Sequence, residues 1–188
     1  MKKILGLGNA LVDALIQIDN DDIFKELHLY KEGMTLIEES THKKIANRLK
    51  SLSFKRSNGG SAGNALSCIA ALGGDASFVG RIGADENGAF YEAESKQRGV
   101  KFIPLRDPSL PTGVANTFIS DGGLRTFATY LGAAALLEAQ HLDAAMPQDV
   151  DYVFIEGYLV QNHELIERAV ELSHQRGAKV CLDLASWN

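Results

Sequence analysis

Short apolar runs alternate along the chain with longer segments in which apolar residues recur at helical spacing. The runs at residues 3–8, 76–80, 151–155 and 178–184 have the length and composition of buried parallel strands. This alternation predicts an α/β fold, in which a parallel sheet is covered by helices. The helices are predicted at residues 20–30, 40–52, 61–72, 85–99 and 163–175.

The alternation breaks after Val100. Two strand-like runs, at residues 112–120 and 124–130, are joined by Asp121-Gly-Gly123, which is a strong β-hairpin signal. With two other extended segments they predict a second, mostly antiparallel sheet beside the ligand end of the core, where it would act as a lid. The lid segments, inserted in the α/β core, are predicted at about residues 11–18, 33–38 and 112–130.

A glycine-rich turn at residues 55–60 runs directly into the predicted helix at 61–72. Gly59 and Gly60 allow another group to approach the backbone closely, because they carry no side chain. Ser61 is a candidate N-cap and Asn64 falls in the first helical turn, so this turn predicts a polar pocket floor. A tight turn before a capped core helix explains the same residues equally well.

Asn9 and Asp13 come just after the first predicted strand. In an extended chain, positions 9, 11 and 13 share one face, so the two side chains can point the same way. Open α/β sheets bind ligands at the carboxyl ends of their strands. A carboxylate accepts hydrogen bonds from hydroxyl groups and an amide both donates and accepts, so this pair suits a sugar. Arg125, just after the hairpin turn, is a candidate contact to a bound anion, although a single exposed Arg is more often solvated.

Composition limits the class of partner. The formal charge of −5 argues against a nucleic-acid or anionic-membrane surface, and no apolar run is long enough to span a bilayer. The N-terminal residues lack the apolar length of a signal peptide, which predicts a cytoplasmic protein. Cys68 and Cys181 fall in apolar patterns and are expected to be buried free thiols, and the histidines show no metal-ligand spacing.

Three motifs, in their order and spacing, resemble the N-terminal half of the ribokinase-like (PfkB) family of sugar and nucleoside kinases, with adenosine-kinase-like members the most similar. The resemblance covers essentially the whole chain, and its motifs are specific in combination. They are Gly8-Asn-Ala-Leu-Val-Asp13, Asn58-Gly-Gly-Ser-Ala-Gly-Asn64 and Gly80-Arg-Ile-Gly-Ala-Asp-Glu-Asn-Gly88.

The resemblance implies a Rossmann-like core with a β-sheet lid. It also implies transfer of the γ-phosphoryl group of ATP, with a divalent metal such as Mg²⁺, to a hydroxymethyl group of adenosine, ribose or fructose type. The partner would be a small-molecule sugar or nucleoside, and a homodimer formed through the lid is compatible with the family. The substrate contacts of the family correspond to Asn9, Asp13, Gly59, Gly60, Asn64 and, more loosely, Arg125.

Two departures from the family pattern concern the chemistry. The run Tyr130-Leu-Gly-Ala-Ala-Ala135 lacks an Asn that many members carry after the lid hairpin. The Gly-Ala-Gly-Asp-type motif that holds the general base and anion hole does not occur, nor does the Asn-x-x-Glu stretch linked to the metal. The base is therefore expected beyond Asn188, so that the chain is an N-terminal part and inactive alone. Asp183 ends a strand and is more readily a cap or turn residue.

Two other functions fit parts of the sequence. A non-catalytic sugar- or nucleoside-binding module would explain the missing base. A dinucleotide-dependent oxidoreductase could use Gly6-x-Gly8, but Leu11 stands where a third glycine is needed. The identity of the phosphoryl acceptor stays open, since its ring would contact loosely constrained positions. Those positions are Leu36, Phe118, Tyr158 and Leu159.

Overall fold

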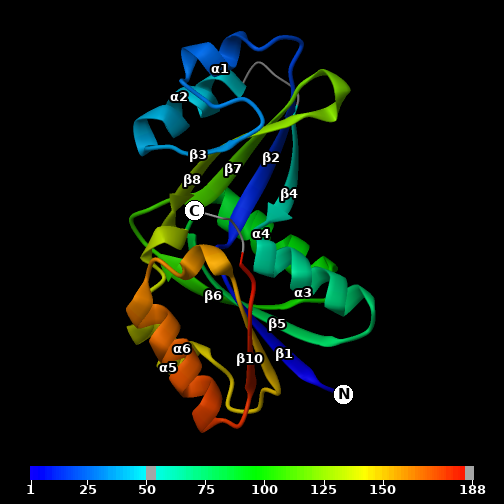
Figure 1. Cartoon of the computed structure of the whole chain (residues 1–188), viewed down its shortest axis with the longest axis vertical. Coiled ribbons are helices and arrows are strands. Elements are labelled where there is room, and N and C mark those ends of the chain that lie inside the picture. Colours follow the sequence, from blue (N-terminus) through cyan, green and yellow to red (C-terminus); the bar gives the residue numbers. More distant parts are fainter. Residues whose placement is uncertain (50–53, 185–188) are drawn as a thin grey trace.

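The chain folds into two sheets that lie along the long axis of the molecule (Figure 1). The computed structural model describes residues 1–49 and 54–184 of the 188-residue chain. The first sheet has five strands in the order β10-β9-β1-β5-β6, and the second has five in the order β3-β8-β7-β2-β4. An α/β fold with a parallel core sheet is thus confirmed.

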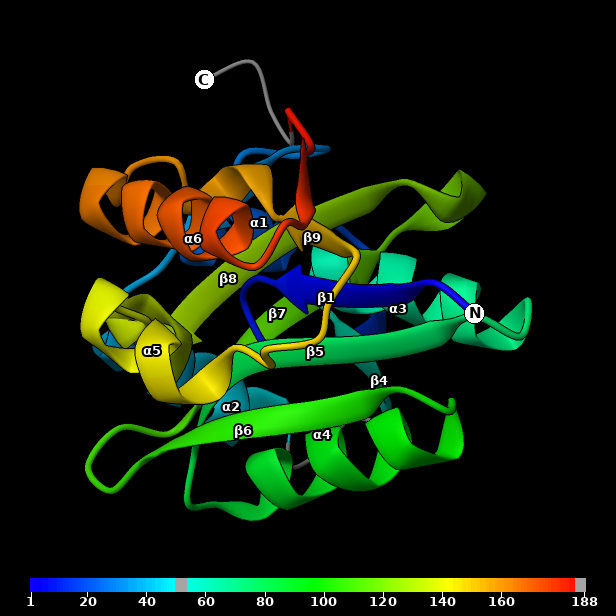
Figure 2. The ribbon, with the colours of Figure 1, turned by 90° about the horizontal axis from the view of Figure 1, so that it is seen from below.

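All strand pairs in the first sheet are parallel, and they follow one another in this order in Figure 2. The sequence analysis missed one of them, the edge strand β6. Pro104 interrupts its apolar pattern and cannot donate a ladder hydrogen bond, which an edge strand tolerates. The strands are β1 (Lys3–Leu7), β5 (Asp75–Gly83), β6 (Lys101–Asp107), β9 (Tyr152–Ile155) and β10 (Lys179–Leu182).

Helices cover both faces of the first sheet. On one face α6 (His163–Gln175) packs Leu165 and Ala169 against the strands, and the structure confirms both predicted bounds of this helix. On the other face α3 (Ser61–Ala71) packs Leu66 against Phe78. The remaining helices beside this sheet are α4 (Glu86–Gln97) and the short α5 (Leu142–Ala145).

The second sheet is mixed, where a mostly antiparallel sheet was predicted. The pairs β2–β7 and β3–β8 are parallel, while β2–β4 and β7–β8 are antiparallel. All three predicted segments occur in it. The glycine-rich turn also contributes an edge strand, β4, which was not predicted because its residues are mostly polar. The strands are β2 (Leu11–Gln17), β3 (Met34–Leu36), β4 (Phe54–Gly59), β7 (Thr112–Ile119) and β8 (Arg125–Gly132).

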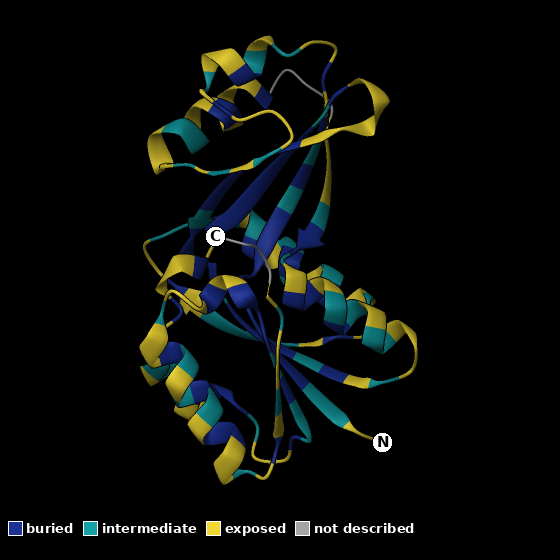
Figure 3. Cartoon of the chain, viewed as in Figure 1, coloured by how far each residue is buried: buried dark blue, intermediate teal, exposed yellow. Residues whose placement is uncertain are grey.

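Two helices cover one face of the second sheet, and the residues between helices and sheet are buried (Figure 3). They are α1 (Asp22–Glu26) and α2 (Glu39–Leu49). The predicted end of the second helix at Leu52 lies outside the described residues. Ile45 and Leu49 on the inner face of α2 are buried against this sheet.

Both cysteines are free, as predicted, but both are exposed rather than buried. Cys68 lies on α3, which turns Ala62, Gly63 and Leu66 toward the interior instead. Cys181 lies on β10, the edge of the first sheet. Among the described residues, no helix is both long and apolar enough to cross a membrane.

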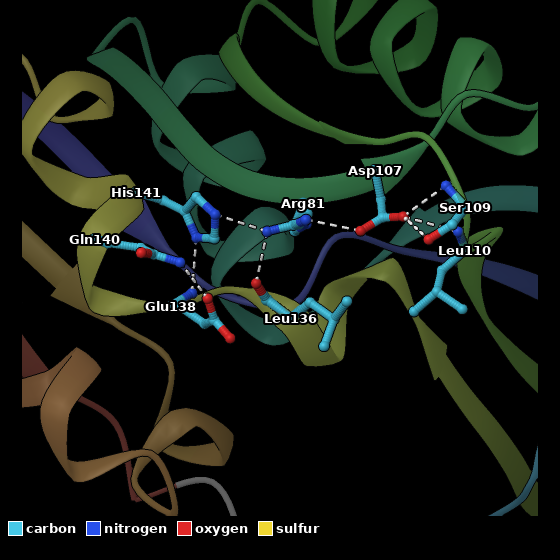
Figure 4. A network of polar contacts seen from close by, with 8 residues as sticks. All are labelled: Arg81, Asp107, Ser109, Leu110, Leu136, Glu138, Gln140 and His141. Carbon is cyan, nitrogen blue, oxygen red and sulfur yellow. Dashed lines mark hydrogen bonds and ion pairs between the residues drawn. The ribbon is translucent and has the colours of Figure 1, made fainter.

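One guanidinium group holds the two crossings between the sheets that flank the β7–β8 hairpin (Figure 4). The chain leaves β6 at Asp107 to enter β7, and it returns from β8 through residues 133–141. Arg81 on β5 donates from Nη2 to Asp107 Oδ2 at 2.7 Å and from Nη1 to the Leu136 carbonyl at 2.9 Å. Its Nη1 also lies 2.8 Å from His141 Nε2. The base of the β7–β8 hairpin is therefore tied to the first sheet at both ends.

The turn after Asp107 strengthens this tie. The Asp107 carboxylate accepts hydrogen bonds from the backbone N–H groups of Leu110 and Ser109 and from the Ser109 hydroxyl. These bonds, together with Arg81, hold the pKa of Asp107 well below its usual range. The carboxylate therefore stays ionised and keeps its partners over the neutral pH range.

Asp85 has two roles at the same junction. It caps α4, because its Oδ1 accepts from the Gly88 N–H at 2.9 Å. The same carboxylate accepts from the N–H and hydroxyl of Thr112, the first residue of β7, at 2.9 and 2.6 Å. The helix cap thus also holds the start of the hairpin.

Replacement of Arg81 by Met should lower the Tm by roughly 5 °C or more, because it leaves the buried Asp107 without its cation. Arg106→Met is the matched control, since Arg106 pairs with Glu92 on the surface and surface pairs contribute little. Differential scanning calorimetry at pH 7 measures both variants. Equal Tm values for them would contradict a structural role of Arg81.

Candidate functional site

A cavity of about 880 Å³ lies between the first sheet and the uncovered face of the second sheet. Its floor is formed where β1, β9 and β10 end, and residues on β2, β3, β7 and β8 form a wall. Four of the sequence-predicted site residues line this cavity. They are Asn9, Asp13, Gly60 and Asn64.

Asn9 and Glu156 meet at the centre of the floor. Asn9 Nδ2 donates to Glu156 Oε1 at 2.7 Å, and the Asn9 backbone N–H donates to the same oxygen at 3.3 Å. Asn9 follows β1 and Glu156 follows β9, and the chain builds outward from β1 toward β5 on one side and β9 on the other. Ligands of open α/β sheets bind at such a switch point.

Glu156 also occupies the N-terminus of α3. Its Oε2 accepts a hydrogen bond from the Ala62 backbone N–H at 3.1 Å. The predicted N-cap role of Ser61 is wrong, because Gly60 is the N-cap and Ser61 is the first helical residue. Gly60 has φ +87°, and a Cβ there would lie 2.2 Å from the Asn9 carbonyl oxygen. Gly60 is thus required by both conformation and space.

Glu156 is only 2% exposed. Burial raises the pKa of Glu156, and the hydrogen bonds from Ala62 and Asn9 act in the opposite direction. Both oxygens of the Glu156 carboxyl group therefore accept hydrogen bonds from groups of the protein itself. Sequence analysis did not single out Glu156, although an acidic residue directly after an apolar strand was a usable signal.

Asp183 stands beside this group at the end of β10. Its Oδ1 accepts from the Gly157 N–H at 2.9 Å, and its Oδ2 accepts from the Ser61 hydroxyl at 3.2 Å. The predicted turn role therefore describes part of its function. Because Asp183 also lines the cavity, it adds a third acidic group to the site.

Asp13 lies on β2 and lines the cavity from the side of the second sheet. It packs directly on Gly59, where a Cβ would lie 2.2 Å from Asp13 Oδ1. Burial raises the pKa of Asp13 to about 6, and the positive charges of Arg125 and Arg98 oppose this shift without cancelling it. Gly59 therefore serves the site by making room for Asp13.

The last two predicted residues lie at different depths. Asn64, in the first turn of α3, is exposed and lines the cavity. Arg125 is exposed at the start of β8 and does not line it, so it reaches the site only through its charge. The structure thus gathers five of the six residues at one place and leaves Arg125 at the periphery.

The walls of the cavity are largely apolar. Leu36 on β3 and Tyr158 after β9 are 58% and 46% exposed and face the open space. Leu159 also lines it, whereas Phe118 is fully buried on the other face of the second sheet against Phe24. Phe118 is therefore excluded as a contact to a ring. Other apolar lining residues are Phe127, Leu131, Leu137, Val160 and Leu182.

The described residues contain no group of three or more His, Cys, Asp or Glu side chains that could hold a metal ion. In the cavity, Glu156 and Asp183 direct their oxygens to protein donors. The residues present do not fit a Mg²⁺ site, and none is assigned to the metal.

Comparisons with known proteins agree with this architecture. The model of the pfkB family carbohydrate kinases matches residues 30–188. The probable sugar kinase protein from Rhizobium etli CFN 42 is 27% identical with a TM-score of 0.85, over 98% of this chain and 56% of its own. The adenosine kinase from Sinorhizobium meliloti is 28% identical with a TM-score of 0.82, over 98% and 57%.

Two relatives found by sequence extend the range of similar proteins. The bifunctional protein HldE of Rhodopseudomonas palustris (strain BisB5) is 31% identical over 145 residues, which are 70% of this chain and 29% of HldE. Adenosine kinase 2 of Arabidopsis thaliana is 24% identical over 165 residues, 84% of this chain and 47% of its own. The chain therefore spans less than half of these two relatives.

Asp13→Asn should stabilise the ligand-free protein at pH 8 by about 1–2 kcal/mol and leave its stability at pH 4 nearly unchanged. The folded-state pKa of about 6 exceeds the ordinary value of 3.8, so wild-type stability from this group is lost as pH rises through that window. Urea titrations at both pH values measure the effect. A variant equally or less stable than wild type at pH 8 would contradict the raised pKa.

Proposed function

Because the chain belongs to the pfkB family of carbohydrate kinases, we propose that it carries the acceptor-binding half and lid of an ATP-dependent kinase. The reaction would phosphorylate a hydroxymethyl group of a sugar or nucleoside, of adenosine, ribose or fructose type. One observation carries this proposal. A cavity with a polar floor of amide and carboxylate groups is bounded by apolar walls.

The floor suits the hydroxyl groups of a sugar. The Asp13 carboxylate has no protein donor among its described contacts, and an ionised carboxylate accepts strong hydrogen bonds from O–H groups. Glu156 fixes the orientation of the Asn9 amide, because Asn9 Nδ2 must face Glu156 Oε1. Asn64 adds a second amide to the lining of the cavity. These groups would fix the sugar so that one hydroxyl points to the donor.

The apolar walls suit a ring carried by the sugar. Leu36 and Phe127 approach from the second sheet, and Tyr158 approaches from the segment after β9. In this proposal the second sheet is the lid, which excludes water from the acceptor. Exclusion of water and exact positioning are most of what phosphoryl transfer requires from a protein.

In this proposal ATP would supply the phosphoryl group, and Mg²⁺ would neutralise part of the charge of its phosphates. The described residues do not provide a metal site, and the general base is expected beyond Asn188. The contribution of this chain is therefore to bind and orient the acceptor.

A homodimer through the lid would not form at the outer face of the second sheet. The reason is that α1 and α2 cover its outer face with a packed apolar core.

The two alternative functions fare differently. A dinucleotide-binding site needs a helix after the first strand, but β1 is followed by β2. Gly6 and Gly8 instead allow close packing, since a Cβ would lie 2.5 Å from Leu66 Cδ2 and 2.7 Å from Glu156 Oε2 respectively. A non-catalytic binding module uses the same cavity and is separated from a kinase by the turnover experiment below.

Asp13→Ala should weaken binding of the best acceptor by about 1.5–3 kcal/mol at pH 8, because a charge-assisted hydrogen bond is lost. Titration calorimetry with adenosine, ribose and fructose measures it. Asp121→Ala, at the exposed hairpin tip, is the control and should bind as wild type does. Wild-type affinity in the Asp13 variant would remove the hydroxyl-binding role.

The 188-residue chain alone should show no ATP-dependent phosphorylation of these acceptors in a coupled assay. Absence of a positioned base costs roughly 10²–10⁴ in rate, and absence of charge stabilisation at the phosphoryl group costs at least as much. Addition of a C-terminal half from a similar kinase should restore turnover. Robust turnover by residues 1–188 would place the catalytic centre in this chain instead.

A further inference from the structure

The charged residues around the cavity are all acidic. Asp13, Glu156, Glu164 and Asp183 line it, and among the described residues no Lys or Arg side chain does. The chain has 19 Lys and Arg residues, so their absence here is not a consequence of composition. His163 is the one basic side chain type in the described lining.

The nearest arginines are engaged or peripheral. Arg98 donates to Glu94 and to the Ser57 hydroxyl, which holds it behind β4. Arg125 is exposed at the start of β8, outside the lining. The described lining therefore presents acidic side chains and no Lys or Arg to a bound anion.

A carboxylate of the protein itself already lies at the N-terminus of α3. Helix N-termini bind phosphates through free N–H groups and the positive end of the dipole. Here the protein places its own carboxylate at that position, because Glu156 Oε2 accepts from the Ala62 N–H. The Ala62 N–H group is therefore already bound to Glu156 and is not free for an anionic substrate.

We propose that this cavity selects acceptors without negative charge and rejects sugars that carry a phosphate or carboxylate group. The inference rests on the proposed function and specifies its substrate class. A phosphate group brings about 1.5–2 negative charges near neutral pH. In the cavity it would face four acidic side chains and lose its hydration without gaining a cation.

The charge of ATP does not conflict with this selection. The anion hole and metal-linked residues that neutralise it are expected beyond Asn188. The rejected charge is therefore one carried by the acceptor inside the cavity.

The test compares two ribosides of similar bulk, isopropyl riboside and ribose 1-phosphate, by titration calorimetry with the 188-residue chain at pH 8. The phosphate should bind at least about 100-fold more weakly, and the gap should narrow as NaCl rises from 0.05 to about 0.5 M. Equal or tighter binding of ribose 1-phosphate overturns the inference and leaves the proposed function standing. If adenosine, ribose, fructose and both ribosides all fail to bind, the proposed function fails and the inference with it.

A charge variant supplies an independent readout. Leu36→Lys adds a cation at an exposed position of the wall, and its stem can pack where Leu36 packs. It should reduce the affinity gap between the two ribosides at least about tenfold, while Leu36→Met should leave the gap unchanged. An unchanged gap in Leu36→Lys would show that shape, not charge, rejects the phosphate.

Discussion

The site depends on one buried carboxylate. Glu156, which directly follows β9, joins the end of β1, through Asn9, to the N-terminus of α3, through Ala62. Burial of a carboxyl group is costly unless its oxygens are satisfied, and here each oxygen has a protein donor. Three elements that are distant in sequence therefore have a single arrangement that avoids this cost. The cavity floor takes its shape from that arrangement.

The second sheet also depends on contacts between segments that are distant in sequence. Residues 11–17 pair with residues 112–119, β3 pairs with β8, and β2 pairs with the distant β4, so β7–β8 is the one local hairpin among the described strands of this sheet. The parallel pairs form only if the first sheet places the start of each strand correctly. Arg81 and Asp85 fix the position of β7 and β8, because they hold the two ends of the hairpin against β5 and α4.

The sequence revealed the features that are local. Helical spacing of apolar residues located α6, and the Asp121-Gly-Gly123 signal located the hairpin. The proximity of Asn9, Asp13, Gly60 and Asn64 followed from strand ends and a glycine turn. Strand β4 and the role of Glu156 were not predictable in this way. A polar edge strand has no apolar pattern, and although Glu156 directly follows an apolar strand, no local feature indicates that it binds the Ala62 N–H group 94 residues away.

The tie at the base of the β7–β8 hairpin also separates two properties that a binding protein must adjust. Arg81 binds both Asp107 and the Leu136 carbonyl, so the chain segment between them is a closed loop. The entropy cost of closing this loop rises only slowly with the length of the β7–β8 hairpin. Residues near the exposed tip at Asp121–Gly123 can then be inserted or removed without moving the floor. The reach of the hairpin over a ligand and the chemistry beneath it can thus vary independently in a protein of this architecture.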